Sequence, residues 1–296
     1  MEEARKITVL LMAYGTPEKR EEVDGYLKDV FNGNKVPEEI IENVTKKYEE
    51  IGFSPLKKIT LRQARLLEKH LKNDGISCTV TVGMKHWHPR IDEAAIKIKQ
   101  TNPKKVIGIV AHPFRSLAGS DGYKKRFSAV FEGKDYYFID DWYRQPALKT
   151  AWLKNIDKSR SEFGANEDIF VVFTSHGLPE RVEDNLYKSQ LNEFVDALCK
   201  GGGIKRYCLA YQNGEHKDWY KPEVMEKVRG LRSEGIKNVL IAPIGYITES
   251  LETLYDIDIM YVKSFENLGM KVRRVECLNE SPELIDAMAE AVKSTL

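Results

Sequence analysis

Short apolar runs alternate along this 296-residue chain with longer segments whose apolar residues recur at helical spacing. The runs are rich in valine and isoleucine, and they lie at Ile7–Ala13, Val106–Ala111, Ile169–Thr174 and Val239–Ala242, with weaker examples at Cys78–Val82 and Tyr207–Ala210. Two of the helical segments are Leu61–Leu71 and Leu191–Leu198, and the second is followed by the glycine run 201–203, which would end a helix. This alternation is typical of βαβ units around a parallel sheet and predicts an α/β fold.

The two halves of the chain resemble each other weakly, because in each half an apolar run is followed by a turn with glycine or proline. The paired segments are LLMAYGTP (10–17) with VVFTSHGLP (171–179) and, more loosely, VIGIVAHPF (106–114) with NVLIAPIGY (238–246). We therefore expect two similar Rossmann-like, doubly wound lobes, residues 1–145 and 146–296, that face each other across a cleft. In such sheets ligands bind beyond the carboxyl ends of the strands, where all four of these turns lie.

Composition excludes several classes of function. Lys and Arg number 46 and Asp and Glu 45, a net charge of +1, so the chain lacks the basic excess that binding to nucleic acid requires. The apolar runs are much shorter than the ~20 residues that cross a bilayer, and the start MEEARK lacks the apolar segment of a signal peptide. We expect a soluble, cytoplasmic protein. The four cysteines form no C-x-x-C pair, so neither a zinc site nor a disulfide framework is predicted.

Polar side chains that could carry chemistry stand at or just after the predicted strand ends, and they are Tyr14, His112, His176, Glu249, Glu252 and Asp256. No strand is followed by G-x-G-x-x-G or by G-x-x-x-x-G-K-[ST], so no nucleotide is expected, and G-x-S-x-G is also absent. His176 could be a base or a metal ligand, or it could be structural. His86 and His88 are two residues apart, the spacing that would place a pair of metal ligands on one face of a strand. Roles in a loop or in packing suit them better.

The segment 243–260, PIGYITESLETLYDIDIM, predicts a helix with Thr248 as its N-cap. Glu249, Glu252, Asp256 and Met260 would then share one helix face, with three carboxylates in a row. The positive end of the helix dipole would account for acids in the first turn, but not for Asp256 two turns further on. Carboxylates and imidazoles suit a divalent first-row metal, and both can accept protons.

Taken together, these segments resemble the ferrochelatases, the enzymes that insert Fe²⁺ into a porphyrin in heme biosynthesis. The resemblance covers nearly the whole chain, and its parts are LLMAYGTP (10–17), SPL…T…QA (54–64), VGMKHWHP (82–89), SHGLPE (175–180), AYQNG…W (210–219) and PIGYITESLETLYDID (243–258). It implies two Rossmann-like lobes with the porphyrin between them. By position, the family's histidine and glutamate are His176 and Glu252, on opposite sides of the macrocycle, and Glu249 and Asp256 would form an outer metal path.

In its details the chain resembles the short members of Gram-positive bacteria that act on coproporphyrin III and use the equivalent of Tyr14 as an axial iron ligand. Many members have a histidine where this chain has Ser250. A basic residue that binds a propionate in such members is Phe31 here, with Lys35, Lys46 and Lys47 nearby. Our candidates for binding the propionates are Lys47, Ser54, Tyr123, Lys124 and Lys125.

The resemblance implies Fe²⁺ as a substrate, a porphyrin as the partner and a monomer, and no iron–sulfur cluster is expected because Cys277 stands alone near the C-terminus. Protoporphyrin IX remains an alternative to coproporphyrin III. Two alternative functions also remain open: a chelatase that inserts Co²⁺ into a tetrapyrrole, since the same ligand types accept several first-row metals, and a two-lobed protein that binds a tetrapyrrole without chemistry.

Overall fold

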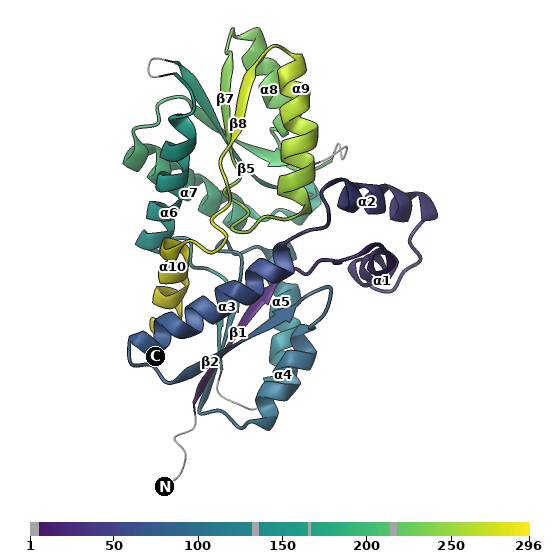
Figure 1. Ribbon diagram of the computed structural model, residues 1–296, viewed down its shortest axis with the longest axis vertical. Coiled ribbons are helices and arrows are strands. Elements are labelled where there is room, and N and C mark those ends of the chain that lie inside the picture. Colours follow the sequence, from purple (N-terminus) through teal and green to yellow (C-terminus); the bar gives the residue numbers. More distant parts are fainter. Residues whose placement is uncertain (1–5, 132–135, 165–166, 214–217) are drawn as a thin grey trace.

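The computed structural model describes residues 6–131, 136–164, 167–213 and 218–296, which form two four-stranded parallel sheets with helices around them (Figure 1). The first sheet has the order β2-β1-β3-β4, with β1 at Ile7–Ala13, β2 at Cys78–Met84, β3 at Lys105–Val110 and β4 at Tyr136–Ile139. The second has the order β6-β5-β7-β8, with β5 at Ile169–His176, β6 at Tyr207–Gln212, β7 at Asn238–Ala242 and β8 at Lys271–Arg274. The prediction of two similar, doubly wound lobes is confirmed.

All six predicted strands are present, and the two strands that the pattern missed, β4 and β8, lie at sheet edges. Each has only four residues, YYFI and KVRR, and β8 carries three basic side chains. An edge strand is covered on fewer sides than a central one, so its sequence need not be a long run of valine and isoleucine.

Most helices lie between consecutive strands, as βαβ units require. In the first half they are α1 Arg20–Val30, α2 Glu38–Glu50, α3 Leu56–Asn73, α4 Ile91–Gln100 and α5 Leu117–Phe131. In the second half they are α6 Pro146–Arg160, the short η1 Glu180–Val182, α7 Asn185–Gly202, α8 Val224–Ser233, η2 Glu252–Tyr261, α9 Val262–Asn267 and α10 Pro282–Lys293. The glycine run ends α7 as predicted, with Gly203 in the left-handed conformation at a φ of 60°.

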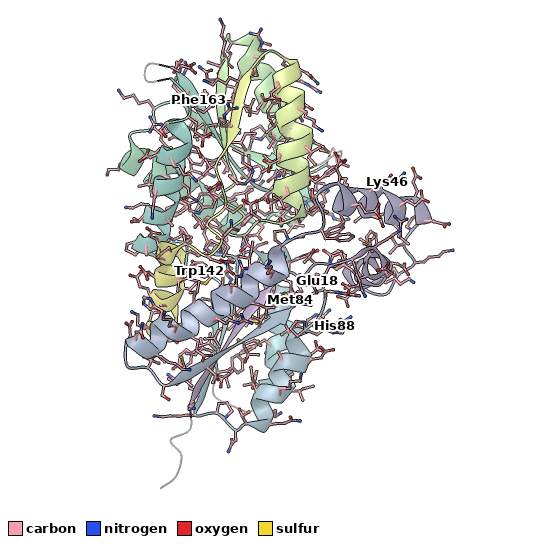
Figure 2. The ribbon with its side chains drawn as sticks, in the orientation of Figure 1. Glu18, Lys46, Met84, His88, Trp142 and Phe163 are labelled. Atoms are coloured by element: carbon pink, nitrogen blue, oxygen red, sulfur yellow. The ribbon has the colours of Figure 1, made fainter. Side chains whose placement is uncertain are left out.

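Helices α1 and α2 form an arm that projects from the first sheet beside the second (Figure 1). Their apolar faces bury Val23, Tyr26 and Tyr48 in a small core of their own, against which Trp87 and Leu251 pack. Leu251 directly precedes η2, so the arm contacts both halves of the chain. Figure 2 shows Lys46 on α2, where its side chain is exposed.

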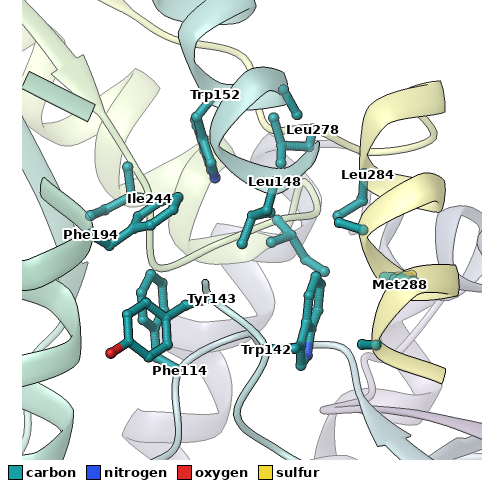
Figure 3. Packing of buried hydrophobic residues seen from close by; sticks show 14 of the residues in the cluster. Phe114, Trp142, Tyr143, Leu148, Trp152, Phe194, Ile244, Leu278, Leu284 and Met288 are labelled. Atoms are coloured by element: carbon teal, nitrogen blue, oxygen red, sulfur yellow. The ribbon is translucent and has the colours of Figure 1, made fainter. Parts of the chain in front are cut away.

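The largest core cluster joins the two sheets rather than belonging to one of them. Phe114 stacks on Tyr143 with ring centroids 5.6 Å apart, and Phe194 of α7 packs edge-on against Phe114 (Figure 3). Trp142 is buried and lies close to Met288 of α10, and α10 in turn packs against both α3 and α6. The last helix, α10, thus covers part of the first half of the molecule. The domain boundary at 145/146 stays a prediction.

The predicted helix start at Thr248 is wrong. Helical structure begins at Leu251, and from Glu252 to Tyr261 it is a π-helix, whose hydrogen bonds run from i to i+5. The Thr248 hydroxyl is engaged by the amide of Gln63 on α3, whose Nε2 donates to it at 2.9 Å. Glu249 therefore precedes the helix instead of standing on its first turn.

Candidate active site

One pocket of about 390 Å³ opens where the carboxyl ends of both sheets meet, within the range of small-molecule sites. Its walls are largely apolar, and its polar lining includes Tyr14, Ser54, Lys85, His112, Tyr123, His176, Tyr187, Ser250 and Glu252. Tyr14 follows β1, His112 follows β3, and His176 ends β5. Of the six side chains expected to converge in one cleft, these three and Glu252 line the pocket, and Glu249 and Asp256 do not.

His176 stands at the pocket wall on a firmly held backbone. The Tyr187 hydroxyl donates to its carbonyl oxygen at 3.3 Å, and the ring lies edge-on to Trp219 with centroids 5.6 Å apart. Gly177 follows, where a Cβ would collide with the amide of Asn213, so only glycine allows this close approach. The imidazole is thus presented at the end of a strand with little freedom in the chain behind it.

Tyr14 lines the pocket and has 41% of its surface exposed. Its ring centroid is 4.7 Å from that of His86, and the Lys85 ammonium is 5.8 Å from the Tyr14 ring. Partial burial and the negative charge of Glu252 raise the pKa of Tyr14 to about 12, so the phenol keeps its proton at neutral pH.

His112 is a second imidazole in the wall. Its Nδ1 lies 2.7 Å from the carbonyl oxygen of Phe114, which can only accept, so Nδ1 carries the proton of the neutral ring. Burial lowers the pKa of His112 to about 4, and the neighbouring His176 adds to this effect. His112 is therefore neutral at physiological pH.

His86 and His88 do not form a metal pair. Both follow the end of β2, in the turn, and they contact different carboxylates: His86 Nδ1 is 3.0 Å from Asp29, and His88 Nδ1 is 3.3 Å from Glu93. The packing and loop roles favoured from the sequence agree with these contacts.

Glu252 opens the π-helix and lines the pocket, and the Ser250 hydroxyl donates to its Oε2 at 2.7 Å. Asp256 lies one turn further along, beyond the residues that line the pocket. Lys47 of α2 reaches it, with Nζ 3.5 Å from Asp256 Oδ1. Burial raises the pKa of Asp256 to about 6, an effect that Lys47 opposes and Glu252 reinforces.

Glu249 does not stand with Glu252 and Asp256. Its Oε1 accepts from Arg274 Nη1 at 2.9 Å and from the backbone amide of Cys277 at 3.0 Å, and its Oε2 accepts from Thr253 at 2.6 Å. Both oxygens are thus engaged away from the pocket lining, which leaves no continuous row of three carboxylates. Among the described residues, no group of three or more His, Cys, Asp and Glu side chains could hold a metal ion.

The candidates for anion binding divide into two groups. Ser54 and Tyr123 line the pocket, and Lys47 of α2 lies beside it, where it pairs with Asp256 of the π-helix. Lys124 and Lys125 are exposed and are not among the lining residues, and Phe31, which caps α1, is also exposed. The remaining lysines near Phe31, Lys35 and Lys46, point to solvent.

Sequence reasoning missed Lys85, a cation in the pocket wall. Its ammonium lies 5.2 Å from the ring centroid of Tyr123, and burial together with Arg126 lowers its pKa. It directly follows β2, whose last three residues are buried, in the segment VGMKHWHP, so its position at a strand end was the signal that could have identified it.

The family model described as Ferrochelatase matches residues 6–296. The chain belongs to the ferrochelatase family. It is thus an enzyme of the chelatase class, a lyase. In the AYQNG…W motif, residues 214–217 lie outside the described part of the chain.

Relatives of this ferrochelatase span its whole length. It is 31% identical to a protein of Halalkalibacterium halodurans over 99% of this chain and 98% of the relative, and 30% identical to a protein of Bacillus subtilis over 99% and 98%. Both relatives are named coproporphyrin III ferrochelatase.

Solved chelatase structures share the fold of this ferrochelatase. SirB from Bacillus subtilis with Fe³⁺ aligns with a TM-score of 0.64 at 11% identity, covering 98% of this chain and 95% of SirB. CbiX, described as the terminal enzyme of siroheme biosynthesis in denitrifying bacteria, aligns with a TM-score of 0.59 at 12% identity, covering 98% and 99%. Within the described residues, no helix combines the length and the apolar character that crossing a membrane would need.

Replacing Arg274 should destabilise the fold, because the Arg274 and Glu249 side chains are only 11% and 12% exposed and Asp258 is bound to the same guanidinium. We expect Arg274→Leu to lower the free energy of unfolding by about 3–5 kcal/mol, since it leaves the buried Glu249 carboxylate without its cationic partner.

Chemical denaturation measures this loss, and Arg20→Leu is the matched control. The Arg20–Glu49 pair is exposed, at 63% and 42%, so that substitution should cost at most about 1 kcal/mol. Equal losses in the two variants would contradict a structural role for the Arg274 ion pair.

Proposed function

We propose that this ferrochelatase inserts Fe²⁺ into coproporphyrin III and releases the two pyrrole N–H protons. The observation that carries the proposal is the shared pocket, to which the first sheet contributes Tyr14 and the second sheet and its π-helix contribute His176 and Glu252. The names of relatives that match the chain from end to end support coproporphyrin III as the porphyrin. The iron porphyrin product is an intermediate of heme biosynthesis.

The reaction makes two demands on the pocket. A flat macrocycle presents its nitrogen lone pairs poorly to an incoming ion, so the largely apolar walls must grip the ring and bend it. Two protons must leave while Fe²⁺ sheds its water ligands. Because protons and metal compete for the same lone pairs, acceptors for both must be close at hand.

His176 and Glu252 divide these tasks. An imidazole and a carboxylate can each accept a proton or bind a first-row metal, and both side chains line the pocket. Asp256, one turn beyond Glu252, carries negative charge toward which hydrated Fe²⁺ is drawn. Glu249 has no part in this path, because both its oxygens are held by Arg274, Cys277 and Thr253.

Tyr14 supplies an oxygen for one face of the iron. Since its phenol is protonated at neutral pH, it binds the metal as a neutral ligand or loses its proton on binding. For the four propionates of coproporphyrin III, Lys85 and Lys47 supply positive charge, while Ser54 and Tyr123 supply hydroxyl donors.

An anaerobic assay of Fe²⁺ insertion, followed by the loss of free-porphyrin fluorescence, tests the function directly. Turnover with Fe²⁺ supports the proposal. Turnover with Co²⁺ alone would assign the chain to cobalt insertion, and porphyrin binding without turnover with either metal would make it a carrier.

His176→Ala should lower kcat for iron insertion by ~10²–10⁴-fold, the usual cost of losing a group that handles protons. Porphyrin affinity should change little, because the imidazole contributes little to the apolar contact area. His88→Ala is the matched control, since His88 is exposed and pairs with Glu93 outside the pocket. Full activity of the His176 variant would refute its assignment.

Glu252→Gln should lower kcat/KM for the metal far more than Asp256→Asn, because Glu252 lines the pocket and Asp256 does not. With a pKa raised to about 6, Asp256 is charged above pH 6 and neutral below it. The Asp256→Asn defect should therefore be present at pH 7.5 and disappear near pH 5. Initial rates at several Fe²⁺ concentrations measure both effects, and small, equal, pH-independent losses would rule out the metal path.

Coproporphyrin III should give a higher kcat/KM than protoporphyrin IX, because it has four propionates instead of two. This preference should shrink as salt rises, since exposed charge pairs are screened over ~10 Å at 0.1 M. Lys85→Met should reduce the preference, whereas Lys124→Met, at an exposed position off the pocket, should not. If kcat/KM for protoporphyrin IX at low salt equals or exceeds that for coproporphyrin III, the substrate assignment is reversed. The assignment of iron insertion would still stand.

A further inference from the structure

Ser250 lies in the short segment that joins the turn after β7 to the π-helix. It is buried, with 7% of its surface exposed, and it lines the same pocket as Glu252. Its hydroxyl donates to Glu252 Oε2 at 2.7 Å, a short distance typical of a hydrogen bond to a carboxylate. Ser250 therefore contacts the acidic side chain on which the proposed reaction depends.

Ser250 is itself held in place by its neighbours. Its backbone amide donates to Thr253 Oγ1 at 2.9 Å, and the same hydroxyl of Thr253 donates to Glu249 Oε2 at 2.6 Å. Glu249 is anchored in turn by Arg274, whose guanidinium also binds both oxygens of Asp258, at 2.5 and 2.8 Å. These contacts link Glu252 to the end of β8 through an unbroken series of hydrogen bonds.

This network limits how the Glu252 carboxylate can turn. The last torsion of a glutamate side chain is broad, so a carboxylate at a pocket wall adopts many orientations unless a donor fixes one oxygen. The Ser250 hydroxyl is such a donor, and the anchored backbone amide behind it fixes the position of the donor as well. A hydroxyl also stays neutral at every physiological pH, so it adds no positive charge that would repel an incoming divalent cation.

We propose that Ser250 is a positioning residue that holds the Glu252 carboxylate in the orientation needed for metal insertion. The inference rests on the proposed function, because Glu252 acts on the proton or the metal only there. Ser250 does not touch the reacting atoms, so its removal should act on kcat and leave porphyrin binding alone.

The test compares Ser250→Thr with Ser250→Val, two variants of the same shape that differ by the hydroxyl. Fe²⁺ insertion is measured anaerobically with coproporphyrin III, and porphyrin affinity by fluorescence. We expect the valine variant to lose about 10–100-fold in kcat with an unchanged KM for porphyrin, in line with the loss of a hydrogen bond to a charged group. The threonine variant should stay within about twofold of the wild type. Wild-type kcat in the valine variant would overturn the proposal.

A double-mutant cycle distinguishes positioning from a general structural defect. Ser250→Ala should lower single-turnover rates in the wild-type background and have no further effect beside Glu252→Ala, because the hydroxyl acts only through that carboxylate. Equal losses in both backgrounds would overturn the proposal. Ser264→Ala is the control, since the Ser264 hydroxyl of α9 donates to the carbonyl oxygen of Met260, four residues earlier, away from the pocket.

Failure of this inference and failure of the proposed function give different results. If the wild-type protein inserts no metal, or if Glu252→Ala is as active as the wild type, the proposed function of the site fails. If Glu252→Ala lowers the rate and Ser250→Ala equals the wild type, only the positioning role of Ser250 fails.

Discussion

The site depends on one constraint, that the strands of both sheets are parallel and that the ends carrying Tyr14 and His176 face a common space. In a parallel sheet every strand delivers the residue after it to the same edge. The shared core around Phe114 and Tyr143 holds the two halves together close behind those edges. Tyr14 and His176 therefore line one pocket although they are 162 positions apart in the sequence and belong to no common motif.

Much of the fold could be predicted because buried parallel strands have a distinct composition. Strands β1, β3, β5 and β7 each consist largely of buried apolar side chains, which only a protein interior can accommodate. The edge strands β4 and β8 were not predicted, because their short sequences contain no long run of buried apolar residues. His176 and Tyr14 could be identified as candidate site residues because each stands at the end of a predicted strand.

What the sequence could not predict depends on partners distant in the chain. Thr248 has the chemistry of an N-cap, but Gln63 of α3 binds its hydroxyl, and the helix starts later. Glu249 is an acid beside a helix, but Arg274 lies 25 residues further on and takes it out of the pocket. The π-helix could not be predicted either. Helix propensities and the spacing of apolar residues apply to α-helices, whose hydrogen bonds run from i to i+4, and not to bonds from i to i+5.

The position of α10 has a consequence for how this protein is made. The apolar side chains of α3, among them Leu67 and Leu71, belong to the same buried cluster as those of α10, and Lys293 pairs with Asp74, 219 residues earlier. During synthesis the amino-terminal half leaves the ribosome first. Its α3 face then stays uncovered until α10 has been translated, so the nascent chain carries an exposed apolar surface through the synthesis of its second half.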